Sequence, residues 1–239
     1  MAPGRRQRPH PFIENRLLAT LPAEAAAKLL AHFESIALQP GDILYKPGER
    51  APYVYFPASC LVSLQYLSRS GGAVEIAAVG TDGLVGVSSL LRSPSTHHAV
   101  IEVGGTAIRM PADVLAVQVV ELEALRVMFH SYLHALLSHI TQNAACNAVH
   151  ALTQRFSRWV LECGDRLDTS EIPATQELIA RLLGVRRESI NHVATALNDA
   201  GVLQNARGHM QILNRAQLES VSCECHGIIR HEYARLLDR

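Results

Sequence analysis

The 239-residue sequence predicts an α+β fold, with an N-terminal antiparallel β-barrel or jelly roll and flanking helices, a long helix, and a C-terminal winged helix-turn-helix. Short extended runs separated by turn signals fill residues 36–110, which is typical of a small antiparallel barrel or jelly roll. A long apolar helical stripe follows in residues 111–166. Residues 175–197 then indicate two short amphipathic helices joined by a tight turn, an arrangement that can lie in the major groove of DNA.

Length and composition limit the architectures that the chain can adopt. With 48% hydrophobic residues, 239 residues can bury one or two ordinary cores, and we expect two domains. Basic and acidic residues are equal in number, so the formal net charge is zero. Any attraction to DNA must therefore come from the local placement of arginine.

The sequence also bears on the compartment in which the protein works. No stretch approaches the roughly 20 apolar residues of a membrane span, and residues 1–16 lack the apolar core of a signal peptide. The five cysteines are an odd number without the spacing of a disulfide framework, which fits a reducing environment. We therefore expect a cytoplasmic protein with no membrane partner.

The N-terminal third begins with an irregular segment and continues into the predicted strands. Residues 1–13 hold three arginines and three prolines without periodicity, and we expect a flexible arm there. Leucines between Asn15 and Phe33 predict two short helices broken at Pro22. Pro-Gly, Gly-Gly and Asp-Gly pairs then separate short runs such as VEIAAV, AVIEV and TAIRM, which we interpret as strands.

The long helical stripe is wider than one small domain needs. Apolar residues recur from Leu122 to Ile140, and a helix of about 28 residues would span about 40 Å. Part of it should therefore pack on another element. We expect its polar residues to face solvent, and we expect a hinge in residues 147–150, after which a second domain begins. The polar residues in question are His130, His134, His139, Asn143 and Asn147.

The helix pair in residues 175–197 carries the side chains that could read DNA. Thr175 is a plausible N-cap of the first helix, and Gly184 should end it. The second helix buries a stripe, which places its remaining polar residues on the opposite side. Arginine can form two hydrogen bonds to guanine, glutamate can accept from cytosine, and asparagine can pair with adenine. We therefore predict the following base-reading residues: Arg187, Glu188, Asn191 and His192.

A plain helical hairpin is the alternative interpretation of these two helices, because amphipathic pairs with a glycine turn are common. The segment QNARGHMQILN favours the DNA-reading interpretation. In it, Arg207 and Gly208 form a predicted turn between two short extended pieces, the order expected of a β-hairpin wing. Two helices followed by a wing are more specific than either feature alone.

The run GVRRESINHVATALNDAGVL with its following wing resembles the winged helix-turn-helix of the Crp/Fnr family of bacterial transcription regulators. The Arg-Glu-Ser/Thr core of that family's recognition helix is matched by Arg187, Glu188 and Ser189. The resemblance implies a homodimer that binds double-stranded DNA. It also implies four parts, which are a flexible arm in residues 1–13, a cyclic-nucleotide-binding-like sensor barrel in 14–120, a dimerisation helix in 121–147, and a winged helix-turn-helix domain with a helical tail in 148–239.

Two departures from the family pattern affect the recognition helix. His192 stands where a second base-contacting arginine is common, so we expect this chain to read a half-site different from that of such relatives. Arg186 replaces a serine that often caps the helix, and we interpret it as a contact to the DNA backbone. The complete set of predicted backbone contacts is Thr175, Gln176, Arg186, Ser189 and Arg207.

The resemblance also locates a short cassette that holds the phosphate of a cyclic nucleotide in some members. Here Gly86 matches its glycine, but Val87 falls where a glutamate is needed, and His97 and His98 replace the arginine and the hydroxyl residue. We therefore predict that the barrel does not bind cyclic AMP in the usual way. An unidentified small-molecule effector could instead occupy a pocket at Gly86, Val87, Ser88, His97 and His98. Adjacent strand residues point to opposite faces, so the two histidines are not expected to hold one ion.

Neither a metal nor catalysis is strongly indicated. Cys223, Cys225 and His226 offer three close ligands without a second cluster at standard spacing, so structural zinc is a weak hypothesis and we expect no cofactor. No H-E-x-x-H, G-x-S-x-G or phosphate-loop motif is present, and we expect no enzyme activity. A ligand-binding or metal-binding sensor, or an enzyme, with a non-DNA partner remains the alternative to a DNA-binding regulator.

Overall fold

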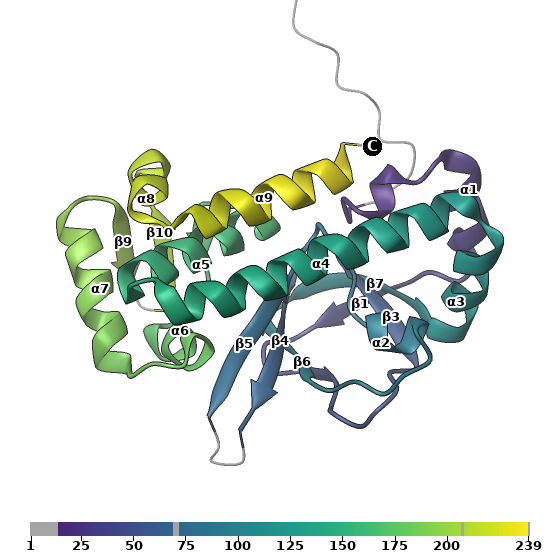
Figure 1. The fold of residues 1–239 in the computed structure, drawn as a ribbon, viewed down its shortest axis with the longest axis horizontal. Coiled ribbons are helices and arrows are strands. Elements are labelled where there is room, and N and C mark those ends of the chain that lie inside the picture. Colours follow the sequence, from purple (N-terminus) through teal and green to yellow (C-terminus); the bar gives the residue numbers. More distant parts are fainter. Residues whose placement is uncertain (1–13, 69–71, 207, 239) are drawn as a thin grey trace, which may run out of the picture.

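The N-terminal part of the molecule is a jelly roll made of two facing antiparallel sheets (Figure 1). The computed structural model describes residues 14–68, 72–206 and 208–238. The strand order is β1-β7-β3 in one sheet and β2-β6-β4-β5 in the other, so the sheets form an open jelly roll and not a closed barrel. The strands are β1 (Glu34–Leu38), β2 (Ile43–Tyr45), β3 (Tyr53–Pro57), β4 (Leu61–Leu67), β5 (Ala73–Val79), β6 (His98–Val103) and β7 (Gly105–Pro111).

Short helical segments close the ends of this jelly roll. The predicted break at Pro22 is confirmed, because a 3₁₀ turn, η1 (Leu18–Thr20), precedes it and α1 (Ala23–Leu30) follows it. The remaining helices of this part are α2 (Val87–Leu90) and α3 (Ala112–Glu121). β5 begins with alternating buried and half-buried residues, whereas β3 and β4 are buried over most of their length. The core between the sheets includes Phe56, Val62, Ile101 and Met110.

The long helix α4 (Glu123–Val149) crosses the jelly roll and extends beyond it (Figure 1). Leu125, Phe129 and Leu136 pack into the jelly-roll core, and the hydroxyl of Tyr132 donates to the carbonyl of Leu84 at 2.7 Å. The helix ends at the predicted hinge. His150 is extended there, with ψ 144°, and α5 (Leu152–Leu167) begins after it. Among the described residues, none of the helices combines the length and hydropathy that a membrane crossing requires.

The C-terminal tail folds back onto α4. Two helices follow the wing, α8 (Arg215–Val221) and α9 (Glu224–Leu237). Asn214 is the N-cap of α8, since its side chain accepts a hydrogen bond from the Gln217 amide at 3.0 Å. Figure 1 shows α9 running along α4, where Tyr233 and Leu236 join the core of the jelly roll. The tail therefore connects the C-terminal domain to the sensor side of the molecule.

The C-terminal domain consists of a helix pair and a small sheet. The helix α6 (Gln176–Leu183) is followed by α7 (Arg187–Asp199), as predicted. The predicted wing is confirmed as the hairpin of β9 (Leu203–Ala206) and β10 (His209–Ile212). A short strand that the sequence did not reveal, β8 (Glu171–Ile172), pairs with β10 and completes the sheet order β8-β10-β9.

A cluster of buried charges on α5 joins the two halves of the molecule. The side chains of Arg158, Glu162 and Arg166 are only 3–4% exposed. Arg158 donates to Glu162 Oε1 at 2.6 Å, and Arg166 donates to Glu162 Oε2 at 3.1 Å. Burial would raise the pKa of Glu162, but Arg158, His139 and Arg166 outweigh it and hold that pKa well below its usual value. The glutamate is therefore ionised and paired on both sides.

The partners of this cluster on α4 correct one expectation. His139 and Asn143 were expected to face solvent, but both are buried. The side-chain oxygen Oδ1 of Asn143 accepts from Arg158 at 2.5 Å, and Arg166 lies 3.3 Å from His139 Nδ1. Burial and the charge of Arg166 lower the pKa of His139, which keeps its ring neutral. These polar residues face α5 because buried guanidinium groups need acceptors.

A second set of contacts fastens the C-terminal domain directly to the jelly roll. The indole of Trp159 on α5 donates to Glu75 of β5 at 3.0 Å, and the Ser63 hydroxyl donates to the other oxygen of Glu75 at 2.6 Å. Arg181 on α6 pairs with Glu102 of β6 at 3.1 Å. The sheet of β2, β6, β4 and β5 therefore touches both α5 and α6.

Glu75 should make the stability of the protein depend on pH. Burial raises its pKa from 4.5 to about 7, so the folded state keeps a proton that the unfolded state releases near pH 4.5. The free energy of unfolding should consequently fall as pH rises from 4.5 to above 7, by about 3 kcal/mol from this group. In Glu75→Gln this fall should be absent, because glutamine stays neutral and retains an acceptor for Trp159. Urea unfolding across this pH range measures the difference, and parallel curves for the two proteins would contradict the prediction.

Candidate nucleic-acid interface

The first helix of the pair, α6, is fixed at both ends by local interactions. The Thr175 hydroxyl accepts a hydrogen bond from the Leu178 amide at 3.1 Å, which confirms it as the N-cap. Gly184 ends the helix with φ +67°, a conformation that other residues adopt only with strain. A side chain there would also come within 3.2 Å of Val74 on β5. The glycine therefore allows the tight turn and the close approach of the turn to the sensor sheet.

The second helix, α7, buries one face and exposes the other. Ile190, Ala194 and Leu197 are buried in the core of the C-terminal domain. The N-cap position is held by Arg186, whose side chain makes no capping hydrogen bond, as expected from the loss of a serine there. The opposite face is exposed, and it carries Arg187, Glu188, Asn191 and His192. The helix thus presents the four predicted base-reading residues together at its N-terminal half.

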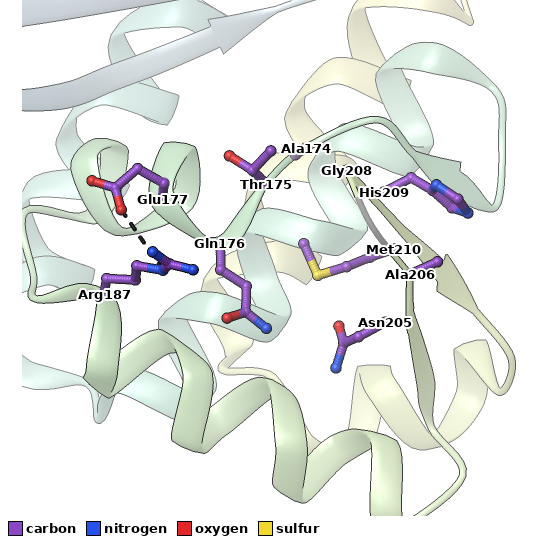
Figure 2. A pocket seen from close by; sticks show the side chains of 10 residues that line it. All are labelled: Ala174, Thr175, Gln176, Glu177, Arg187, Asn205, Ala206, Gly208, His209 and Met210. Carbon is purple, nitrogen blue, oxygen red and sulfur yellow. Dashed lines mark ion pairs between the residues drawn. The ribbon is translucent and has the colours of Figure 1, made fainter.

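Two shallow cavities mark this face. One, of about 350 Å³, is lined by Gln176 of α6 and by the four exposed residues of α7. The other, of about 410 Å³, lies between the starts of α6 and α7 and the wing (Figure 2). Its α-helical side includes Gln176, Glu177 and Arg187, and its wing side includes Asn205, His209 and Met210. The exposed face of α7 is therefore flanked by the wing.

One interaction holds a predicted base reader in the free protein. Arg187 Nε lies 3.8 Å from Glu177 Oε2, and Figure 2 shows the two side chains facing each other across the turn. The side chains of Arg187 and Glu177 are 67% and 74% exposed, respectively. Ion pairs in water at this exposure contribute little. Arg187 can therefore leave Glu177 for another partner at small cost.

The predicted backbone contacts lie at the edge of the same face. Thr175 and Gln176 begin α6, and Arg186 and Ser189 begin α7, so all four lie where helix N-termini favour anions. Arg207 lies outside the described residues. Sequence analysis missed Asn205 and His209 of the wing, although both lie within two residues of the predicted turn.

The residues of the predicted effector pocket come from two elements of the jelly roll, the start of α2 and the start of β6. Gly86 is the N-cap of α2 with φ +108°, and Val87 packs against the jelly-roll core. His97 lies against Tyr45, with its Nε2 3.1 Å from the tyrosine hydroxyl. Burial lowers the pKa of His97, and the neighbouring His98 lowers it further. Ser88 contacts Ser93 through its carbonyl oxygen.

The cysteines near the C-terminus have partners that the sequence did not suggest. His226 lies 2.9 Å from Asp165 and apart from its neighbours Cys223 and Cys225. These two cysteines instead meet Cys146 and His150 at the end of α4. The sequence signal was the spacing of Cys146 and His150, which places both on one face of a helix, but more than 70 residues separate them from Cys223.

Comparison with known proteins identifies both halves of the chain. Residues 35–119 match the model of the cyclic nucleotide-binding domain, and residues 154–221 match the model of the Crp-like helix-turn-helix domain. Comparison with curated protein sequences gives no match.

Several solved structures share the fold. FixK2 from Bradyrhizobium japonicum has a TM-score of 0.70 at 17% identity and covers 80% of this chain and 98% of its own. A putative transcriptional regulator of the Crp/Fnr family from Eubacterium rectale has a TM-score of 0.65 at 18% identity, with coverages of 84% and 94%. A Crp-family regulator from Thermus thermophilus has a TM-score of 0.65 at 19% identity, with coverages of 79% and 96%.

The cap of α6 should contribute measurably to stability. Replacing Thr175 by alanine removes the oxygen that accepts from the Leu178 amide, and we expect a loss of about 1 kcal/mol in the free energy of unfolding. Thr175→Ser keeps the oxygen and is the matched control. Urea unfolding compares the two variants, and equal stability of both would contradict the role of the cap.

Proposed function

We propose that this chain, which belongs to the Crp/Fnr family of transcription regulators, binds DNA as a homodimer. Its site on DNA would be two-fold symmetric, and α7 of each chain would read base edges there. The observation that carries the proposal is the exposed face of α7. Arg187, Glu188, Asn191 and His192 lie there side by side, flanked by the wing. Arginine, glutamate and asparagine have the donors and acceptors that distinguish base pairs in the major groove.

The surroundings of this face suit phosphate contacts. The N-termini of α6 and α7 both lie beside it, and Arg186 adds an exposed cation. We assign Thr175, Gln176, Arg186 and Ser189 to the DNA backbone, and we keep the same assignment for Arg207, which lies outside the described residues, from the sequence alone. Such contacts position a protein on DNA without reading its sequence. A DNA partner is also consistent with the cytoplasmic location that we propose.

The exposed face of α4 supports the homodimer. Residues 127–154 contain no aspartate, glutamate, lysine or arginine, although one side of this helix faces solvent. Val127 and Leu137 are 45% and 64% exposed on that side, and Thr141, Ala144 and Ala148 continue the stripe at spacings of three and four residues. An uncharged stripe at this spacing suits a second α4 in a coiled coil. Pairing there would bring two copies of α7 to adjacent major grooves, about one helical turn apart.

We also propose that the jelly roll does not bind a cyclic nucleotide through the phosphate-binding cassette used by some members of the family. A phosphate held between helix amides and an arginine needs both groups. Val87 is apolar and packs on the core, and His97 is held against Tyr45 with a lowered pKa, so it carries no charge at neutral pH. A different small molecule would be the effector of this jelly roll.

The DNA-reading proposal is tested with a duplex selected by the wild-type protein from a random pool. On that duplex, Arg187→Ala should cost about 1–3 kcal/mol and relax selectivity at one base pair of each half-site. Arg186→Ala is the matched control and should weaken selected and random duplexes about equally, because it removes a phosphate contact. Fluorescence anisotropy at two salt concentrations measures both, and affinity should fall steeply with salt. If Arg187→Ala also weakens both duplexes equally, Arg187 is not a base reader.

The prediction for the sensor is tested by isothermal titration calorimetry with cyclic AMP. We expect no saturable heat at micromolar nucleotide, because the glutamate and arginine positions of the clamp hold Val87 and a neutral His97. The same preparation should bind its selected duplex, which shows that the protein is intact. Saturable binding at one site per chain would contradict the prediction.

A further inference from the structure

Four metal-binding side chains converge at the hinge between α4 and α5. Cys146 and His150 lie one turn apart at the end of α4, and Cys223 and Cys225 lie at the start of α9. Their ligand atoms, three sulfurs and one imidazole nitrogen, all lie within 4.8 Å of one another. Two segments that are more than 70 residues apart in the sequence therefore supply one compact set of donors.

The distances within this set fit a single tetrahedral ion. The Sγ atoms of Cys146 and Cys223 are 3.5 Å apart, and Cys225 Sγ is 3.4 Å from His150 Nδ1. Zinc at about 2.3 Å from sulfur and about 2.0 Å from nitrogen requires ligand atoms about 3.5–3.8 Å apart at tetrahedral angles. Three thiolates and one imidazole are a common structural zinc set, and so close a set leaves no room for a cluster of several iron atoms.

The groups around the four side chains are those that a zinc site needs. Glu224 Oε1 lies 3.3 Å from His150 Nε2, the ring nitrogen that does not face the sulfurs. A carboxylate in this position orients a ligating histidine and fixes its tautomer. The Gln142 amide donates to Cys225 Sγ at 3.1 Å. Zinc with three thiolates carries a net negative charge, and Arg155, which donates to the side-chain oxygen of Asn147 next to Cys146, supplies a nearby cation.

We propose that Cys146, His150, Cys223 and Cys225 bind one zinc ion, which fastens the start of α9 to the end of α4. All three cysteines are buried, and the His150 side chain is 15% exposed. An unoccupied set of three buried thiols would leave weakly hydrogen-bonded sulfur at the hinge, whereas an ion would bind all four groups at once. Because the ligands come from distant segments, zinc binding stabilises the folded chain directly.

The site is coupled to the DNA-reading helices through Arg155. This side chain donates to the side-chain oxygen Oδ1 of Asn147 at 3.1 Å, and Asn147 lies between Cys146 and His150 in the sequence. It also donates to the carbonyl oxygen of Leu183, the last residue of α6, at 2.6 Å. The ion would thus fix the position of α6, and with it α7, relative to α4. This consequence, unlike the zinc site itself, rests on the proposed function.

The test is the zinc content of the full-length protein, purified under reducing conditions with any affinity tag removed. We expect one zinc per chain by mass spectrometry, and a cobalt-substituted sample should show the visible bands of tetrahedral cobalt and a thiolate charge-transfer band. Cys223→Ser and Cys225→Ser should lose the metal. Two controls should keep it: Cys60→Ser, a buried cysteine of the jelly roll, and His226→Gln, the histidine that pairs with Asp165.

A variant that keeps all four ligands separates metal binding from folding. Glu224→Gln removes only the carboxylate on His150, and we expect zinc affinity to fall about tenfold in competition with a chelator. Chelation of wild-type protein should lower its melting temperature, and added zinc should restore it. A wild-type protein that takes up no zinc, a cobalt spectrum without thiolate bands, or a disulfide between Cys146 and Cys223 under reducing conditions would overturn the proposal.

The coupling to DNA has its own readout. Zinc-depleted protein should bind the selected duplex more weakly, and zinc should restore the affinity. If zinc binds as expected but depletion leaves DNA affinity unchanged, the coupling through Arg155 is wrong and the site stands. If no form of the protein selects a duplex, the proposed function fails, while zinc content still decides the metal site.

Discussion

The pairing of buried charges on α5 constrains the arrangement of every other part of the molecule. Arg158 and Arg166 are buried on either side of Glu162, and their remaining partners come from α4 and from Asp82 in the jelly roll. A buried charge that loses its partner costs about 3–5 kcal/mol, so few other packings of α4, α5 and the jelly roll are tolerable. Replacing such a cluster by apolar residues is often no less stable, so what it supplies here is the orientation of these elements.

This orientation decides how the sensor side and the reading side can communicate. Trp159 and Arg181 reach from the C-terminal domain to Glu75 and Glu102 on the sensor sheet, and α9 returns from that domain to the jelly roll. The first helix of the pair, α6, therefore contacts the jelly-roll sheet directly, and the hinge at His150 is spanned by contacts on more than one side. A change in the jelly roll that shifts these contacts would move α6, so they are a physical route from the jelly roll to the DNA-binding surface.

Local pattern was sufficient for much of this structure. Apolar periodicity predicted α4, α6 and α7, and the caps at Thr175, Gly184 and Asn214 are where side-chain chemistry places them. The buried charges of α5 and its partner His139 could not be predicted, because a charged residue on an amphipathic helix gives the same pattern whether it faces water or a partner. The convergence of Cys146 with Cys223 was also beyond local pattern, since it depends on α9 folding back along α4.

The central claim is that paired copies of α7, held at a fixed separation by two α4 helices, read the edges of base pairs. The most direct measurement is the structure of the protein bound to its selected duplex. We expect two chains to bind each duplex, with their α7 helices in successive major grooves about 34 Å apart. We also expect Arg187 to contact the edge of a base. A single chain on the duplex, or α7 away from the major groove, would contradict it.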